Sequence, residues 1–285
     1  MQRLNFLGKI VLPLIFITAV LNCCKAKKYI YKSPPHYDFS KSFEDKLDLR
    51  IKEISGIVWD SRKDEFITHN DESGKIFYLD KESKLIKREF HFAGKGDYED
   101  IAIVNGVPYI LKSDGEITKI IADSTGKQFA VEAGKIPLSG ANDFESMYYD
   151  SSRSALIVLC KNCKIDDKKT ISAFAFYPDS IGFVDKPVFT IDLAKVAELS
   201  PRATTRLEPS AAAVHPKLHK VFIVSSGSNQ LLIADLDGNP EAVFMLAKKL
   251  FPQPEGITFK NNGDMYISNE GVSGKGTLLR FIYTP

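Results

Sequence analysis

Short apolar runs alternate with polar turns along this chain, and the alternation recurs as a longer repeat from residue 53 onward. Each copy begins with two acidic or hydrogen-bonding residues two positions apart and continues as an apolar strand, a turn and a second strand. Repeats with a period of about 45 residues are typical of solenoids, propellers and arrays. The copies begin at Glu53–Ile57, Asp97–Ile101, Asp143–Met147, Glu208–Ala212 and Gln253–Ile257.

The segments within each copy have the length and composition of β-strands. They are short, rich in Ile, Val, Phe and Tyr, and separated by Asn-Gly or Asp-Gly pairs that favour tight hairpin turns. No long segment shows the 3.6-residue apolar period of an amphipathic helix, so little helix is expected. The predicted strands of the first and last copies are Ser55–Trp59, Glu65–His69, Lys75–Leu79, Gly256–Phe259, Asp264–Ser268 and Thr277–Tyr283.

The interval between the third and fourth copies is longer than the others. It contains the polar stretch Asp166–Lys169 and the segment Asp192–Arg206, in which one helical turn is expected at Leu193–Leu199. Strands at Ala155–Cys160, Ile171–Tyr177 and Pro187–Ile191 would complete the third unit. Four strands per copy at this period predict the blade of a β-propeller.

The fifth copy ends after three strands, which would leave an open sheet edge. Folds manage such edges by pairing or covering them. Tyr37–Leu49 precedes the first copy and has no blade of its own, so we expect it to supply the fourth strand of the last blade. The sequence therefore predicts an all-β, five-bladed propeller of four antiparallel strands per blade, as one domain over residues 37–285. A six-bladed ring is the alternative.

The N-terminus has the pattern of a targeting segment. Arg3 and Lys9 precede the apolar stretch Ile10–Leu21, which suits a signal sequence and is too short for a typical membrane span. Cys23 and Cys24 follow it, as in the lipobox of bacterial lipoproteins. We predict a signal peptide over residues 1–23, lipidation at Cys23 or Cys24, and a tether over residues 24–36; a plain cleaved signal and an uncleaved anchor are the alternatives.

The charge balance argues against a nucleic-acid-binding protein, and the cysteine positions bear on whether the chain contains a disulfide. Acidic and basic residues nearly balance, at 36 Asp and Glu against 38 Lys and Arg, so there is no basic excess of the kind that binds nucleic acid. Cys160 and Cys163 lie at the end of a predicted strand rather than at a strand-to-helix junction. A structural disulfide is the favoured interpretation for an exported protein; free thiols and redox or metal chemistry remain open.

The repeated polar positions are the candidate functional residues. In a propeller the first strand of each blade lines the central channel, and residues two apart point to the same face, so these side chains should converge at one mouth of the channel. Clustered carboxylates are costly unless paired or bound to a cation, and their oxygens are ligands that Ca²⁺ prefers. The predicted metal ligands are Glu53, Asp97, Glu99, Asp143, Glu145 and Glu255. Further predicted ligand-binding residues are Asn70, Asp71, Glu208, Asn269 and Glu270.

A structural role for these acids is the alternative, in which they cap strands and pair with Arg202, Arg206 or Lys161 and bind no ligand. His69 adjoins the predicted mouth and is the histidine that we would test as a general base. No P-loop, nucleophile elbow or dinucleotide fingerprint occurs in the sequence.

Four segments resemble the SdiA-regulated, or YjiK-type, β-propeller family: Glu53–Asp60, Asn70–Ile76, Gly96–Ile101 and Pro254–Ile257. Similar motifs recur in phytase-like and gluconolactonase-like propellers. The resemblance implies an exported bacterial propeller with no well-established enzymatic activity. It also implies that the acids named above are the candidates for a calcium site, because some relatives are linked to calcium responses and some neighbouring groups bind calcium at the channel mouth. Ser210 and Ala211 depart from the acidic pattern in the fourth copy.

These features together predict a lipid-anchored binding module, exported to the outer membrane or the periplasmic face. Its acidic mouth would bind Ca²⁺, a small molecule or a protein, without catalysis. The alternative is a metal-dependent hydrolase of the phytase-like or lactonase-like type. A hydrolase acting on an anionic substrate needs basic groups, and few lie near the predicted mouth: Lys112, Lys161, Arg202 and Arg206.

Overall fold

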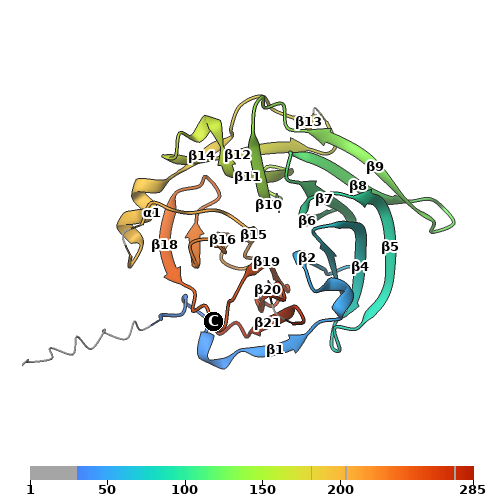
Figure 1. Cartoon of the computed structure of the whole chain (residues 1–285), viewed down its shortest axis with the longest axis horizontal. Helices are drawn as coiled ribbons and strands as arrows, with labels where there is room; N and C mark the ends of the chain where they lie inside the picture. Colours follow the sequence, from blue (N-terminus) through green and yellow to red (C-terminus); the bar gives the residue numbers. More distant parts are fainter. Residues whose placement is uncertain (1–30, 181, 203, 273) are drawn as a thin grey trace, which may run out of the picture. The chain divides into compact units, whose positions relative to one another are not determined.

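The computed structural model describes residues 31–285 except residues 181, 203 and 273. It is an all-β propeller in which five antiparallel sheets, the blades, form a ring around a central channel (Figure 1). The prediction of five blades is confirmed, and the six-bladed alternative is wrong. The predicted signal sequence, the two candidate lipidation sites and most of the predicted tether lie outside the described residues.

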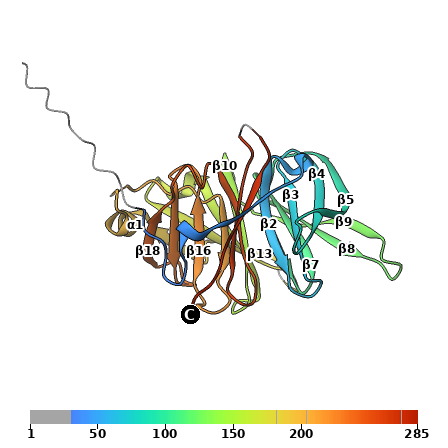
Figure 2. The same cartoon turned by 90° about the horizontal axis from the view of Figure 1, so that it is seen from below.

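The first two blades are regular four-stranded sheets. Blade 1 consists of β2 (Ile54–Asp60), β3 (Glu65–Asn70), β4 (Ser73–Asp80) and β5 (Ile86–Lys95). Blade 2 consists of β6 (Tyr98–Val104), β7 (Val107–Lys112), β8 (Glu116–Ala122) and β9 (Gln128–Lys135). Figure 2 shows the β8–β9 hairpin projecting beyond the rest of the ring.

Blade 3 differs because its outer edge is made of two short pieces that both pair with β12. Its strands are β10 (Asn142–Asp150), β11 (Ala155–Cys163), β12 (Thr170–Tyr177), β13 (Gly182–Phe183) and β14 (Phe189–Asp192). The helical turn expected after this blade is the helix α1 (Leu193–Leu199), which begins where the Asp192 carboxylate accepts a hydrogen bond from the Ala194 N–H. Short 3₁₀ turns occur at Phe39–Lys41, Leu49–Ile51 and Lys164–Asp166.

The N-terminal segment closes the ring, as predicted. Blade 4 consists of β15 (Ala211–Val214), β16 (Val221–Ser225), β17 (Gln230–Ala234) and β18 (Pro240–Met245). Blade 5 consists of β19 (Pro254–Phe259), β20 (Met265–Asn269), β21 (Thr277–Phe281) and β1 (Phe43–Lys46). β1 pairs antiparallel with β21, so the first strand of the described chain is the outer strand of the last blade.

The core consists of five apolar clusters, each spanning two adjacent blades. Blades are thus held to their neighbours mainly by side-chain packing between sheets, with the polar residues left at the channel and the rim. The cluster between blades 4 and 5 also buries Tyr37 and Phe39 of the N-terminal segment. Among the described residues, no helix has the length and apolar content needed to cross a membrane.

Candidate functional site

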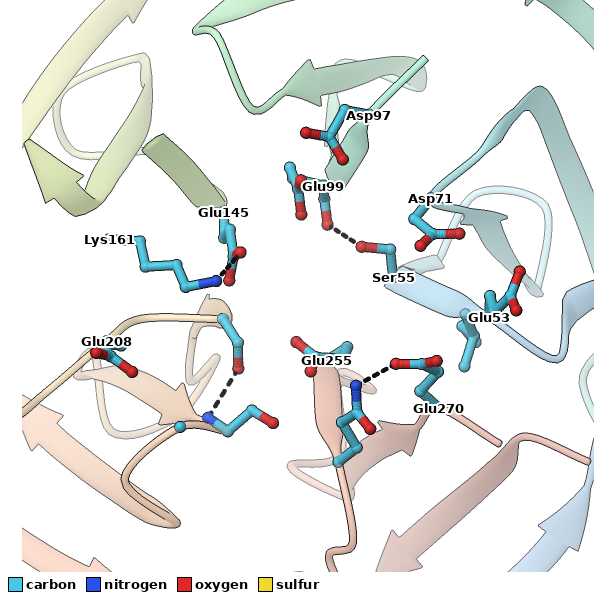
Figure 3. Close-up of a pocket in the computed structure, with 15 residues that line it drawn as sticks. Glu53, Ser55, Asp71, Asp97, Glu99, Glu145, Lys161, Glu208, Glu255 and Glu270 are labelled. Atoms are coloured by element: carbon cyan, nitrogen blue, oxygen red, sulfur yellow. Dashed lines mark hydrogen bonds and ion pairs between the residues drawn. The ribbon is translucent and has the colours of Figure 1, made fainter. Parts of the chain in front are cut away.

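One mouth of the central channel is a cavity of about 370 Å³ (Figure 3). All five blades contribute carboxyl groups to it, and among the described lining residues Lys161 is the single basic side chain. The charged lining residues are Glu53, Asp71, Asp97, Glu99, Glu145, Lys161, Glu208, Glu255 and Glu270. Eight carboxyl groups therefore face one ammonium group across a space large enough for a small ligand.

β-Bulges aim the innermost of these side chains. In four blades the register between the first two strands shifts by one residue, which leaves the residue at the second repeated position without a cross-strand partner. A bulge of this kind bends the strand and re-aims the extra side chain, and bulges recur next to functional sites. The four extra residues all line the cavity: Ser55, Glu99, Glu145 and Glu255.

Burial and mutual repulsion make two of these carboxyl groups hold their protons at neutral pH. Desolvation raises the pKa of Glu99 to about 9, with repulsion from Glu145 and Asp97 adding to it. Desolvation likewise raises the pKa of Glu255 to about 8, with Glu145 the next cause. The pKa of Glu145 is also raised by burial, although its ion pair with Lys161 opposes this rise.

Three acids of the mouth are paired with bases, which is the structural role that the sequence left open; one is Glu53, whose Oε1 lies 3.6 Å from the Lys52 ammonium. The Lys161 ammonium contacts Glu145 Oε1 and lies 4.0 Å from Asp143 Oδ2. Arg206 donates two hydrogen bonds of 2.9 Å to the Glu208 carboxylate. Such pairs explain part of the acidic pattern without a ligand, but they leave the other five carboxyl groups of the cavity to be explained.

The serines of the pattern link neighbouring blades. Ser55 Oγ donates a hydrogen bond of 2.9 Å to the Glu99 carbonyl oxygen, and Ser210 Oγ donates one of 2.8 Å to that of Pro254. These hydrogen bonds connect the inner strands of adjacent blades around the channel. Ser55 and Ser210 therefore have a structural role, although both also line the cavity.

One predicted metal ligand, Asp143, and two predicted ligand-binding residues, Asn70 and Asn269, do not line the cavity. Asp143 lines an adjoining cavity of about 690 Å³ between blades 3 and 4, which shares Lys161 and Glu208 with the mouth. Asn70 shapes its own turn, since its Oδ1 accepts hydrogen bonds from the Ser73 N–H and hydroxyl. Asn269 is buried in blade 5.

His69 does not face the cavity either. The ring is fully buried beneath Gly56, and its Nδ1 donates to the carbonyl oxygen of Asn70 at 3.1 Å. Burial lowers the pKa of His69 to about 4, so the ring is neutral at physiological pH. His69 is the histidine that the sequence suggested as a general base. Because its ring lies in the interior, it would not contact a ligand in the mouth.

The cavity has the oxygen ligands of a calcium site, but among the described residues no three of its carboxyl groups have ligand atoms all within 4.8 Å of one another. Carboxylate oxygens are the ligands that Ca²⁺ prefers, and Oδ1 of Asp71 is buried with no hydrogen-bond partner in the described structure. However, the one described group of three His, Cys, Asp or Glu side chains with ligand atoms all within 4.8 Å is Cys160, Cys163 and Asp166, and those two cysteines form a disulfide. The residues fit Ca²⁺ in kind, and water ligands would have to complete its shell.

The contact of the Lys161 ammonium with Glu145 inside the cavity was not predicted from the sequence. From the sequence, Lys161 was expected near the mouth, as one of four basic residues there and as a base that could pair with nearby acids. The signal that could have located it is its position between Cys160 and Cys163, at the end of the second strand of the third copy.

The fold is shared with several solved structures at low sequence identity. A glutaminyl cyclase from Myxococcus xanthus is 12% identical, with 85% of this chain and 96% of that chain covered and a TM-score of 0.57. A protein of unknown function from Bacteroides thetaiotaomicron is 13% identical, with 80% and 55% covered and a TM-score of 0.54. A gluconolactonase from Xanthomonas campestris is 12% identical, with 85% and 78% covered and a TM-score of 0.50. At these identities the likeness shows the fold alone.

Sequence comparison identifies the family. No curated protein matches the chain. The model of the SdiA-regulated family matches residues 35–272, a range that begins before the closing strand β1 and ends between β20 and β21. It therefore takes in all five copies of the acidic repeat and agrees with the resemblance carried by the sequence motifs. The chain belongs to the SdiA-regulated family.

Proposed function

We propose that this protein is a non-catalytic binding module whose acidic channel mouth binds a cation, with Ca²⁺ as the first candidate. The observation that carries the proposal is the set of eight carboxyl groups around one cavity, two of which have a pKa raised to about 8 or 9. A cation in the cavity would stabilise the ionised form of these groups and release their protons. Cation binding at neutral pH would therefore be coupled to the loss of protons from Glu99 and Glu255.

A ligand that carries an ammonium or guanidinium group is the second candidate. A specific contact favours it, because the Lys161 ammonium already lies among the carboxylates of this cavity and contacts Glu145. The cavity of about 370 Å³ also exceeds the need of a single bare ion. An amine of a small molecule or a lysine side chain of a partner protein has the matching chemistry.

Hydrolysis by a bound metal is the alternative function. The gluconolactonase and the glutaminyl cyclase share the fold at 12% identity, which lends no residue-level support to either activity here. The mouth has one basic side chain among its described lining residues, and His69 is buried away from it. A binding role is therefore the simpler account of the site.

The proposed setting is the outside of the bacterial cytoplasm, with the protein held to a membrane by lipid on Cys23 or Cys24. The apolar stretch Ile10–Leu21 followed directly by cysteine supports this location. The Cys160–Cys163 disulfide fits an oxidising compartment. Mass spectrometry of the protein purified from membranes would detect a diacylated N-terminal cysteine, and an intact or unlipidated N-terminus would contradict the anchor.

Thermal unfolding of the purified protein tests the binding proposal. The midpoint is measured in EDTA and then in millimolar CaCl₂, MgCl₂ and spermidine at constant ionic strength. A ligand that binds the native state raises the midpoint by mass action. A rise with Ca²⁺ and not Mg²⁺ supports the first candidate, a rise with spermidine alone supports the second, and no rise with any of them contradicts cation binding. Assays with a lactone and a phosphomonoester, with and without Ca²⁺, test the hydrolase alternative.

A further inference from the structure

Lys161 and Glu145 face each other across a double bulge. In the β10–β11 ladder, Phe144 pairs with Cys160, Asp143 with Asn162, and Ser146 with Leu159. Lys161 on β11 and Glu145 on β10 are thus both left without a cross-strand partner. Each is the extra residue of its strand, and Figure 3 shows both side chains pointing into the cavity and meeting there.

A disulfide closes the bulge that carries Lys161. Cys160 and Cys163 are bonded to each other, with Cα atoms 5.7 Å apart, and Lys161 lies in the loop between them. Both cysteines are buried in the cluster between blades 2 and 3, Cys160 fully and Cys163 to all but 5%, and Cys163 also lines the adjoining cavity of about 690 Å³. The cross-link fixes both ends of the loop and so limits the positions that the Lys161 backbone can adopt.

We propose that Lys161 determines the cation affinity of the mouth: its ammonium occupies the place of a ligand cation beside Glu145, and the Cys160–Cys163 disulfide holds it there. The inference rests on the proposed function in one respect, namely that the mouth binds cations. An incoming cation must displace the ammonium or share Glu145 with it. Lys161 is then a built-in competitor that keeps the site weak while the disulfide is intact.

The disulfide makes this competition sensitive to redox state. Cys163 is 5% exposed and lines the adjoining cavity, so this cavity would be the route by which a small dithiol attacks its sulfur and releases the Cys160 thiolate. The second thiol of the reductant then resolves the mixed disulfide, so the protein gains two thiols and the dithiol becomes a cyclic disulfide. Without the cross-link the loop relaxes, Lys161 leaves Glu145 more readily, and the site binds cations more tightly.

Calcium binding by calorimetry tests the competitor role. The variants are Lys161→Met, Cys160→Ala/Cys163→Ala and, as a matched control, Lys220→Met, which also removes one ammonium group in contact with a glutamate at similar exposure. We expect the Kd for Ca²⁺ to fall about tenfold in Lys161→Met, since a like charge a few ångströms away is removed. A smaller fall is expected in the cysteine variant and no more than a twofold change in the control. An unchanged or weaker Kd in Lys161→Met, with binding by the wild type intact, overturns the competitor role.

A measurement without any ligand separately tests whether the Cys160–Cys163 disulfide holds Lys161 in place, a role called the clamp below. The acylation rate of each lysine by an amine-reactive reagent is measured by peptide mass spectrometry before and after reduction with dithiothreitol. The Lys161 side chain is 30% exposed and that of Lys220 is 33% exposed, so accessibility alone predicts equal rates. We expect Lys161 to react several times faster after reduction and Lys220 to be unchanged; equal rates before and after overturn the clamp. If no variant binds Ca²⁺, the calcium proposal and the competitor role both fail, while this measurement still decides the clamp.

Discussion

The Tyr37 hydroxyl lies 2.7 Å from Nε2 of His215 and 2.6 Å from the carbonyl oxygen of Gly263. Nδ1 of His215 accepts hydrogen bonds from the backbone N–H groups of Lys217 and Leu218, both at 3.1 Å, so that nitrogen carries no proton. The proton of the neutral ring is therefore on Nε2, which donates to Tyr37, and Tyr37 in turn donates to Gly263. This chain of hydrogen bonds ties the closing N-terminal segment to blades 4 and 5.

We expect Tyr37→Phe to destabilise the protein by about 1–3 kcal/mol, because it leaves a buried N–H and a buried carbonyl without their partner. Urea unfolding followed by tryptophan fluorescence measures the change. Tyr148→Phe is the matched control, since the Tyr148 hydroxyl is buried with no hydrogen-bond partner and its loss should cost little. Equal destabilisation of the two variants would show that the Tyr37 network adds nothing beyond packing.

His215 should make the fold sensitive to mild acid. Protonation would place a hydrogen on Nδ1 against two N–H donors, and burial lowers the pKa of the ring from 6.5 to about 4. The folded state then binds fewer protons than the unfolded state, so this contribution is complete above pH 6.5 and is lost as the pH falls toward 4. The difference in unfolding free energy between wild type and His215→Gln should shrink over that range; a constant difference would contradict the assignment.

Glu99 and Glu255 should have the opposite effect. Their pKa values are raised from 4.5 to about 9 and about 8, so the folded state binds more protons than the unfolded state between these limits. The contribution of these two groups to the free energy of unfolding is therefore largest below pH 4.5. It falls as the pH rises from 4.5 to about 8 for Glu255 and to about 9 for Glu99. Each group contributes a slope of at most about 1.4 kcal/mol per pH unit.

The Glu99→Gln and Glu255→Gln variants test this slope. Glutamine keeps the shape of the protonated acid and cannot ionise, so each variant should gain stability over the wild type as the pH is raised from 6 to 9. Equilibrium unfolding in urea at several pH values gives the comparison. Parallel curves for wild type and both variants would show that these carboxyl groups are ionised without penalty.

Gly56 is required by the packing beneath the mouth. A Cβ added there would lie 2.8 Å from His69 Nε2, 2.9 Å from Asp100 Oδ1 and 3.0 Å from Asp100 Cα. Because one of these contacts is with backbone, relief needs a shift of blade 2 against blade 1. We expect Gly56→Ala to cost about 1–3 kcal/mol. Gly126→Ala is a less crowded comparison, since nothing lies within 4 Å of its added Cβ, although its positive φ adds strain of its own.

The architecture could be predicted from the sequence because it depends on local patterns. Turn pairs such as Asn262-Gly263 and the two-residue alternation of short strands specify the hairpins, and the number of copies of the repeat specifies the number of blades. The missing fourth strand of the last copy identified the closing segment, since an open edge has to be covered. Each of these inferences needs only residues that are close together in the chain.

The site was harder to predict because it depends on register and on contacts between blades. Alternation along a regular strand placed the repeated acids near the channel, but it cannot reveal that the register shifts at Glu99 and Glu145. Those bulges decide which side chains reach the cavity. The sequence also shows Asn70 and Asp71 as equivalent neighbours, whereas one closes a turn and the other lines the mouth. Their difference arises from tertiary packing.

A pair of substitutions tests the mouth as a calcium site. Glu99→Gln/Glu145→Gln removes two carboxyl groups that line the cavity from blades 2 and 3, so the rise in unfolding temperature with Ca²⁺ should be lost or greatly reduced. The control is Glu44→Gln/Glu132→Gln, which likewise replaces two glutamates by glutamine, here at two exposed positions outside the cavity. Stabilisation follows RT ln(1 + [Ca²⁺]/Kd), so a hundredfold weaker Kd removes up to about 2.7 kcal/mol at saturating calcium. A rise that persists in the mouth variant would place the calcium elsewhere, and a loss in both variants would show that overall charge, rather than this cavity, attracts the ion.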